Sequence, residues 1–165
     1  MTSKSAYLKA RYATAYIILA ALMICCQGRD SFRVPRVQTA ENGWENYIPK
    51  IDINKETAEE LKPGQDSPEA AVVHFYASMI RKDNACLDVL PPSLKPSDEV
   101  YERVQEIKEW TFNNVELWSR KEFARDRYWI LIHMEIEFQG KSKSGEDEVE
   151  VQLIGGKWCV VRPPL

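Results

Sequence analysis

A large apolar side chain occupies every second position from Tyr128 to Phe138. The even positions carry large apolar side chains, whereas the odd positions change from apolar to charged toward the end of the segment. A period of two residues is typical of a β-strand with one buried face. Because this segment is longer than most strands, we expect it at the centre of a bent antiparallel sheet, with its even side chains in the core.

A helical pattern begins at Ser67, where Pro68 and Glu69 follow a residue that is favoured as a helix N-cap. The pattern breaks after one helix, and a short second helix is expected over about 85–90, ahead of two prolines. A third helix is expected to begin near Ser97. The sequence therefore predicts three helices ahead of the strands.

Two further strand segments, 149–154 and 157–161, flank Gly155 and Gly156. Two glycines between alternating segments are typical of a hairpin with a two-residue turn. The pairs expected on the core face are Val151 with Val160 and Leu153 with Trp158. In the same register Cys159 faces away from the core.

With a weaker strand at Val115–Ser119, these elements predict an α+β fold, in which three N-terminal helices pack on one face of a curved four-stranded antiparallel sheet. This domain is expected over 67–165. The preceding segment, 26–66, has no sustained period and is interrupted by prolines and glycines, so we expect a tether that is mostly irregular. One short helix, capped by Asn54, is expected within it over 55–61.

Residues 1–25 have the order of an export signal: basic residues from Lys4 to Arg11, an apolar run, and then Cys25 and Cys26. The run is shorter than a comfortable membrane span. This order resembles a bacterial lipoprotein signal, which implies lipid attachment at Cys26 (or Cys25). The alternatives are an uncleaved N-terminal anchor and ordinary secretion. The expected location is the bacterial cell envelope, with the lipid-anchored domain in the periplasm or otherwise outside the cytoplasmic membrane.

The net charge of −3 hides an asymmetry, because residues 1–25 carry three cations and no acid. The remainder is therefore acidic and contains no basic stripe. This distribution argues against nucleic acid as a partner. The expected partners are the membrane, through a lipid anchor, and a protein or small molecule.

The opening Ser67-Pro-Glu-Ala-Ala-Val, the Lys82-Asp that follows the first helix, and a strongly alternating end that closes on Gly156-Lys-Trp-Cys-Val-Val together resemble a known family. They are similar to the nuclear-transport-factor-2-like, or cystatin-like, α+β cone, and most similar to small bacterial lipoproteins of unknown function that carry one such domain. The resemblance covers about 67–161. It implies a curved sheet around the first helix, a pocket at the open end of the cone, and an outer sheet face that often forms dimers. This fold hosts many activities, so it does not fix the function.

The sequence contains few residues that suggest catalysis. Its two histidines, His74 and His133, are expected on a polar helix side and on the outer sheet face, outside any cone pocket. No spacing predicts a metal site, and no glycine-rich loop predicts a phosphate site, so no cofactor is expected. Glu135, Glu137 and the acidic 146–148 segment are interpreted as solvated strand ends. The expected function is a non-enzymatic binding or assembly domain. The alternatives are a small pocket enzyme and an uncleaved, N-terminally anchored component of a membrane machine.

Two groups of residues are candidates for binding, one for a small ligand and one for a second copy of the chain. The candidates for lining a pocket that binds an apolar ligand are Tyr76, Met79, Tyr128, Ile130 and Trp158. Aromatic and methionine residues at this spacing are more often ordinary core residues. Candidates for a homodimer face are Trp129, Leu131 and His133, although Trp44, Tyr47 and Ile48 of the tether could cover the same face. Cys86 and Cys159 are expected to be unpaired, because they are predicted on opposite sides of the sheet.

Overall fold

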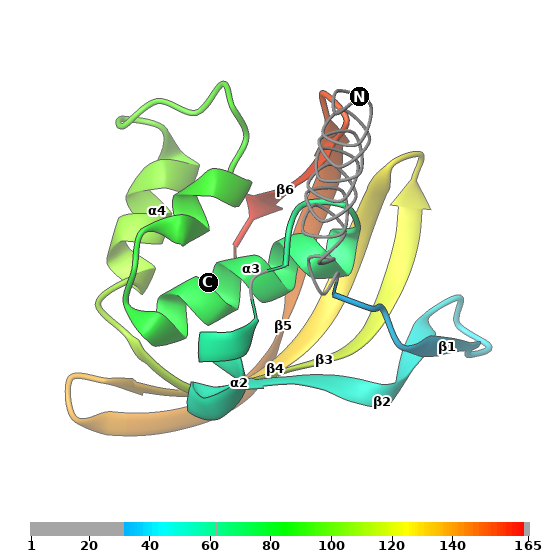
Figure 1. The fold of residues 1–165 in the computed structure, drawn as a ribbon, viewed down its shortest axis with the longest axis horizontal. Coiled ribbons are helices and arrows are strands. Elements are labelled where there is room, and N and C mark those ends of the chain that lie inside the picture. The colour runs from blue at the N-terminus through cyan, green and yellow to red at the C-terminus, as the bar shows by residue number, and fades with distance from the viewer. Residues whose placement is uncertain (1–31, 62, 164–165) are drawn as a thin grey trace, which may run out of the picture. The chain divides into compact units, whose positions relative to one another are not determined.

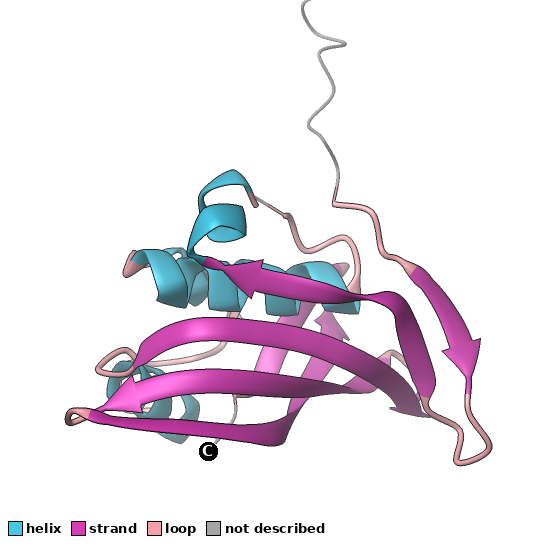
Figure 2. Ribbon diagram, turned by 90° about the horizontal axis from the view of Figure 1, so that it is seen from below, coloured by secondary structure: helices cyan, strands magenta, loops and turns pink. Residues whose placement is uncertain are grey.

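The structure is a computed structural model that describes residues 32–61 and 63–163 (Figures 1 and 2). The strands of this part are β1 (Arg36–Thr39), β2 (Glu45–Asn54), β3 (Thr111–Ala124), β4 (Arg127–Phe138), β5 (Lys141–Ile154) and β6 (Lys157–Arg162). The helices are α2 (Lys55–Glu60), α3 (Pro68–Arg81), the 3-10 helix η1 (Ala85–Val89) and α4 (Glu99–Ile107). The six strands form one antiparallel sheet in the order of the chain.

The expected four-stranded sheet behind three N-terminal helices is wrong. The sheet has six strands, and β1, β2 and α2 all precede the main helix α3. The two additional strands come from the 26–66 segment that was expected to be mostly irregular. The interpretation failed because Pro49 interrupts the alternation of β2, and a proline within a run argues against a strand. In the structure, β2 pairs with β1 up to Ile48 and resumes its pairing with β3 at Ile51, so the irregularity falls at the proline.

The inner side chains of β2 contribute to the main core. Tyr47, Ile51 and Ile53 are buried, whereas Ile48 keeps 52% of its surface exposed. Tyr47 therefore does not fold over the outer sheet face, which was one of the two covers considered for that face. The segment extends the sheet at the free side of β3 instead.

Several local predictions about the helices are confirmed. Ser67 caps α3, and its hydroxyl accepts a hydrogen bond from the Ala70 amide at 3.0 Å. Asn54 caps α2 and forms a reciprocal capping box with Thr57. The second helix, expected over about 85–90, is the 3-10 helix η1 at Ala85–Val89, and the third helix is capped by Asp98, one residue after Ser97. α3 packs against β2, β3, β5 and β6, and the sheet curves around it (Figure 2).

The alternation along β4 is confirmed. Ile130 and Ile132 have no exposed surface, and Met134 and Ile136 are also buried. β4 pairs with β3 on one side and with β5 on the other, which makes it a central strand. Its odd-numbered side chains lie on the face opposite α3.

The hairpin of β5 and β6 has the predicted register, with Val151 opposite Val160 and Leu153 opposite Trp158. Gly155 and Gly156 have φ angles of +59° and +80°. Two consecutive positive φ angles favour glycine, because a side chain at Cβ disfavours this conformation. The glycine pair is therefore what permits the tight turn. β5 begins earlier than expected, at Lys141, because the polar 141–145 segment continues to pair with β4.

Candidate functional site

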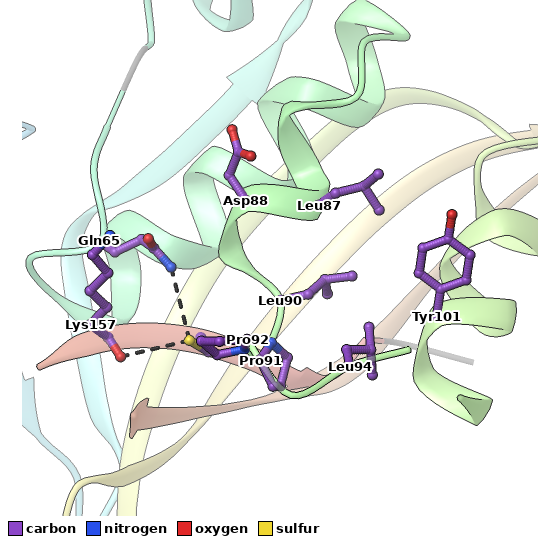
Figure 3. A pocket seen from close by; sticks show the side chains of 10 residues that line it. Gln65, Leu87, Asp88, Leu90, Pro91, Pro92, Leu94, Tyr101 and Lys157 are labelled. Atoms are coloured by element: carbon purple, nitrogen blue, oxygen red, sulfur yellow. Dashed lines mark hydrogen bonds between the residues drawn. The ribbon is translucent and has the colours of Figure 1, made fainter. Parts of the chain in front are cut away.

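A cavity of about 330 Å³ lies beside β6, the last strand of the sheet (Figure 3). Its walls come from four parts of the chain that the fold brings together: the segment ahead of α3, η1 with the turn after it, α4, and β6. The lining residues are Gln65, Leu87, Asp88, Leu90, Pro91, Pro92, Leu94, Tyr101, Lys157 and Cys159. We call this space the β6 cavity.

The apolar wall of the β6 cavity is built by the chain segment that ends η1. Pro91 and Pro92 stop the helix, since proline lacks the amide hydrogen that a further turn would use. The Leu94 amide then donates a hydrogen bond to the Pro91 carbonyl oxygen at 3.0 Å, which turns the chain back. Leu87, Leu90 and Leu94 thereby line the same space, and Leu90 is buried.

The opposite wall is polar and is fixed to β6. The Trp158 amide donates to the Gln65 carbonyl oxygen at 3.1 Å, and the Gln65 side-chain amide donates to the Trp158 carbonyl oxygen at 2.9 Å. Lys157 and Asp88 are exposed and carry opposite charges at this cavity. The cavity is therefore lined by charged and amide groups from η1, β6 and the chain ahead of α3, together with leucine and proline side chains.

Cys159 lines the same cavity, which corrects the expectation that it points away from the helices onto an open face. Only 1% of its surface is exposed, and its Sγ lies 3.9 Å from Nε2 of Gln65. The chain around Gln65 and Pro91 covers this end strand, a packing that strand alternation does not predict. Burial raises the pKa of the Cys159 thiol, and the charge of Lys157 opposes that rise. Cys86 and Cys159 are both free thiols.

A second polar centre lies at the start of α3. Oε1 of Glu69 accepts hydrogen bonds from the Tyr47 hydroxyl at 3.0 Å and from Nη1 of Arg120 at 2.7 Å. Nε of Arg120 donates to Oε2 of Glu45 at 2.6 Å. These four residues, which we call the Glu69 network, connect β2, β3 and α3. The sequence marked Glu69 only as an acid in a first helical turn, and no local signal pairs it with Arg120.

The Glu69 network is largely shielded from water. Glu69 has no exposed surface, and its second oxygen, Oε2, has no hydrogen-bond partner within the described residues. Burial and the adjacent Glu69 charge raise the pKa of Tyr47. Burial by itself would lower the pKa of Arg120, but its bonds to Glu45 and the charge of Glu69 raise it. The network therefore keeps a neutral phenol and a charged guanidinium around one carboxylate, which fixes three elements together.

The five residues considered as the lining of a pocket lie in two places. Tyr76, Met79 and Ile130 are buried in the main core. Tyr128 and Trp158 are partly exposed and meet edge to face, with ring centroids 5.5 Å apart. None of the five lines the β6 cavity, since three pack within the core and the other two contact each other.

The residues considered for a dimer face do lie together on the outer sheet face. Trp129, Leu131 and His133 are all partly exposed. Two further aromatic residues, which no sequence pattern marked, join them: Phe123 stacks on Trp129 with centroids 4.9 Å apart, and Trp118 stacks on His133 at 5.1 Å. The bulges of β3 bring these aromatic side chains alongside β4, and bulge positions cannot be located by strict alternation.

Cations complete both aromatic stacks. Lys50 places its ammonium 3.5 Å from the Trp118 ring centroid. Arg162 and Arg127 place their guanidinium groups 5.6 Å from Trp129 and 5.1 Å from Phe123, respectively. The rings are thus held between neighbours, which restricts their rotamers.

His74 is partly buried and not a plain surface residue. Its Nδ1 lies 2.6 Å from the Pro63 carbonyl oxygen, and its Nε2 lies 3.1 Å from the Ala85 carbonyl oxygen. The imidazole therefore bridges the chain ahead of α3 and the start of η1. These contacts are structural.

Other candidates are exposed or outside the described part. Glu135 and Glu137 are exposed, and the described residues contain no cluster of three or more His, Cys, Asp or Glu that could hold a metal ion. Cys25, Cys26 and the rest of 1–25 lie outside the described residues. Among the helices that the structure does describe, none has the length and apolar character needed to cross a membrane.

Comparisons of this chain with protein-family models, with curated protein sequences and with solved structures found no match. The resemblance to the nuclear-transport-factor-2-like cone therefore stays a prediction.

Proposed function

We propose that this protein is a lipid-anchored component of the bacterial envelope, whose domain works by binding and assembly rather than by catalysis, and that its outer sheet face pairs with a second copy. The anchor is supported by the order of basic residues, apolar run and cysteines in 1–26. The pairing is supported by one row of side chains on β4.

The outer row of β4 runs from a cation to two carboxylates. It starts with Arg127, passes through Trp129 and Leu131, and ends with exposed Glu135 and Glu137. A two-fold interface brings the same patch of both subunits together, so the patch must be complementary to itself. A row that is cationic at one end, apolar in the middle and acidic at the other meets this requirement.

The geometry of the proposed dimer follows from the position of its two-fold axis along β4. A two-fold axis near Ile132 sets the two β4 strands antiparallel, with Arg127 against Glu137 of the partner copy. Leu131 then lies near the centre, where an interface excludes water. Arg127 also forms an ion pair with Glu150 of its own chain, but a guanidinium has further N–H groups that remain to donate.

The rings beside this row suit an interface core. Trp118 and Trp129 are held in stacks before any partner arrives, so little side-chain freedom is lost on association. Tryptophan and arginine are the residues that most often dominate binding free energies. Exposed Glu146 and Glu148 on β5 limit the patch on that side, so the contact is centred on β3 and β4.

Sedimentation of a chain that starts at Gln27 tests the pairing, because this chain keeps every described element. We expect a dimer at micromolar concentration. Leu131→Glu should make it monomeric, since a carboxylate would be buried at the centre. Glu137→Arg should weaken the dimer about tenfold or more, because it sets two cations against each other. Val37→Glu is the matched control: Val37 is 36% exposed on β1, away from β4, so this variant should remain dimeric.

A monomeric wild-type chain at tens of micromolar would refute the pairing. Equal dissociation caused by Leu131→Glu and Val37→Glu would refute the assignment of the face. Circular dichroism of each variant verifies that the fold is kept.

A further inference from the structure

We infer that the β6 cavity binds a small zwitterion with an apolar side chain, the chemistry of a free aliphatic or aromatic amino acid. This inference is independent of the pairing proposed above, because it concerns residues of η1, α4 and β6 and not the outer row of β4. It rests on the distribution of charge and apolar surface around the cavity.

The cavity is lined by two residues of opposite charge, Lys157 and Asp88. Within the described part of the chain, the ammonium of Lys157 and the carboxylate of Asp88 form neither an ion pair nor a side-chain hydrogen bond. Lys157 comes from β6, whereas Asp88 comes from η1, so the two charges approach the space from different elements. A ligand that has both a carboxylate and an ammonium complements this arrangement, while an ion of a single charge complements only half of it.

The apolar wall complements a side chain of that ligand. In Figure 3, Gln65 and Lys157 lie on one side of the cavity, and Leu94 and Tyr101 lie on the other. Leu87 and Leu90 continue the wall toward Leu94, and the rigid Pro91 and Pro92 help to form it at no cost in side-chain freedom. An apolar side chain of the ligand would bury this aliphatic surface, while the ligand's carboxylate and ammonium bind Lys157 and Asp88.

The size of the cavity limits the ligand. At about 330 Å³, the cavity is at the lower end of the range of small-molecule sites, which is roughly 300–1,000 Å³. A single large amino acid fits this scale. Gln65, which is held to Trp158 by two hydrogen bonds, supplies a fixed polar edge beside Lys157.

Cys159 offers a test of occupancy, because this residue lines the cavity although only 1% of its surface is exposed, whereas Cys86 belongs to the main core and does not line the cavity. The full-length protein in detergent micelles is treated with iodoacetamide, and alkylation is followed at each cysteine by peptide mass spectrometry. L-Leucine and L-phenylalanine should slow alkylation of Cys159 in a saturable way and leave Cys86 unchanged. Isothermal titration of the same ligands should give a matching dissociation constant.

Ligands that lack one charge test the chemistry of recognition. N-acetyl-leucine has no ammonium, and leucinamide has no carboxylate. Each should bind about tenfold or more weakly, which is the loss expected for one charged hydrogen bond. Lys157→Met should remove the preference for leucine over leucinamide, and Asp88→Asn should remove the preference over N-acetyl-leucine. Lys141→Met and Asp126→Asn make the same chemical changes on exposed residues outside the cavity and should alter neither preference.

The inference is overturned if no amino acid protects Cys159 or gives heat of binding. It is also overturned if leucine, N-acetyl-leucine and leucinamide bind equally, or if the two control variants reduce binding as much as Lys157→Met and Asp88→Asn do. A dimer that still forms in each of these cases separates this failure from a failure of the proposed pairing.

Discussion

Nη1 of Arg120 lies 2.7 Å from Oε1 of Glu69, a carboxylate with no exposed surface. The pair joins β3 to the first turn of α3, and the Tyr47 hydroxyl adds β2 to the same oxygen. Burying a carboxylate costs free energy unless a partner compensates for the water that it loses. The hairpin of β1 and β2 is therefore held to the rest of the domain partly by one electrostatic centre.

Arg120→Met should lower the free energy of unfolding by about 3–5 kcal/mol, because it leaves the Glu69 carboxylate buried without its cation. Arg120→Met combined with Glu69→Leu should lose clearly less than the sum of the two single changes, because no uncompensated charge remains. Urea denaturation measures both. Arg103→Met, which removes a surface ion pair with Glu106, is the control and should cost less than about 1 kcal/mol. Additive losses at Arg120 and Glu69 would contradict this account.

Tyr47 should make the domain less stable in alkaline solution. Its pKa in the folded protein is raised above the ordinary value of 10.0, mainly by burial. Above about pH 10 the unfolded chain therefore loses a proton that the folded chain keeps, so the free energy of unfolding falls as the pH rises, by up to about 1.4 kcal/mol per pH unit for one proton. Below pH 9 this contribution is constant.

Tyr47→Phe should make the free energy of unfolding fall less steeply with pH above pH 10, by the contribution of about one proton. A part of the fall should remain, because burial also raises the pKa of Tyr76. Urea denaturation at intervals between pH 8 and pH 11 measures the two slopes. Identical slopes for the wild type and Tyr47→Phe would show that the Tyr47 phenol ionises freely in the folded state.

Ile132→Ala should cost about 2–5 kcal/mol, because Ile132 has no exposed surface at the centre of β4 and its removal leaves a cavity. Leu131→Ala, one residue earlier and on the opposite face, should cost much less when the protein is monomeric. Chemical denaturation at a concentration below the dimer dissociation constant makes this comparison. Equal losses at the two positions would mean that both faces of β4 are buried in the single chain.

The N-terminus should be processed and acylated at Cys26 (or Cys25). Metabolic labelling with a palmitate analogue should mark the wild type, and changing both cysteines to serine should abolish the label. Cys25→Ser and Cys26→Ser, made singly, identify the acceptor. A mature mass that still includes residues 1–24, or a label that survives the double change, would contradict the proposed anchor.

Local chemistry allowed much of the fold to be predicted. The alternation of β4 specified its buried face, since successive strand side chains point to opposite sides of the sheet. Ser67 specified the start of α3, and Gly155 with Gly156 specified the turn of the last hairpin. In each case the signal lies within a few residues and acts on their own backbone, so no distant part of the chain is needed to interpret it.

The candidate sites could be predicted from the sequence only in part. β2 was missed because Pro49 interrupts it, and beyond this proline its strand pairing is with β3, more than sixty residues later in the chain. Arg120 and Glu69 meet across 51 positions of the chain. Cys159 was placed on an open face because strand alternation does not include the chain around Gln65 and Pro91 that covers β6.

The sequence by itself therefore determined the elements with strong local patterns and the faces that they bury. Only the tertiary structure decided the number of strands, the ion pair at the start of α3, and the meeting of Lys157, Asp88 and the leucines at one cavity. The physical reason is the range of the forces involved. Backbone preferences and hydrophobic periodicity act between near neighbours in the chain, whereas burial, charge pairing and cavity shape depend on which distant segments the packed core brings together.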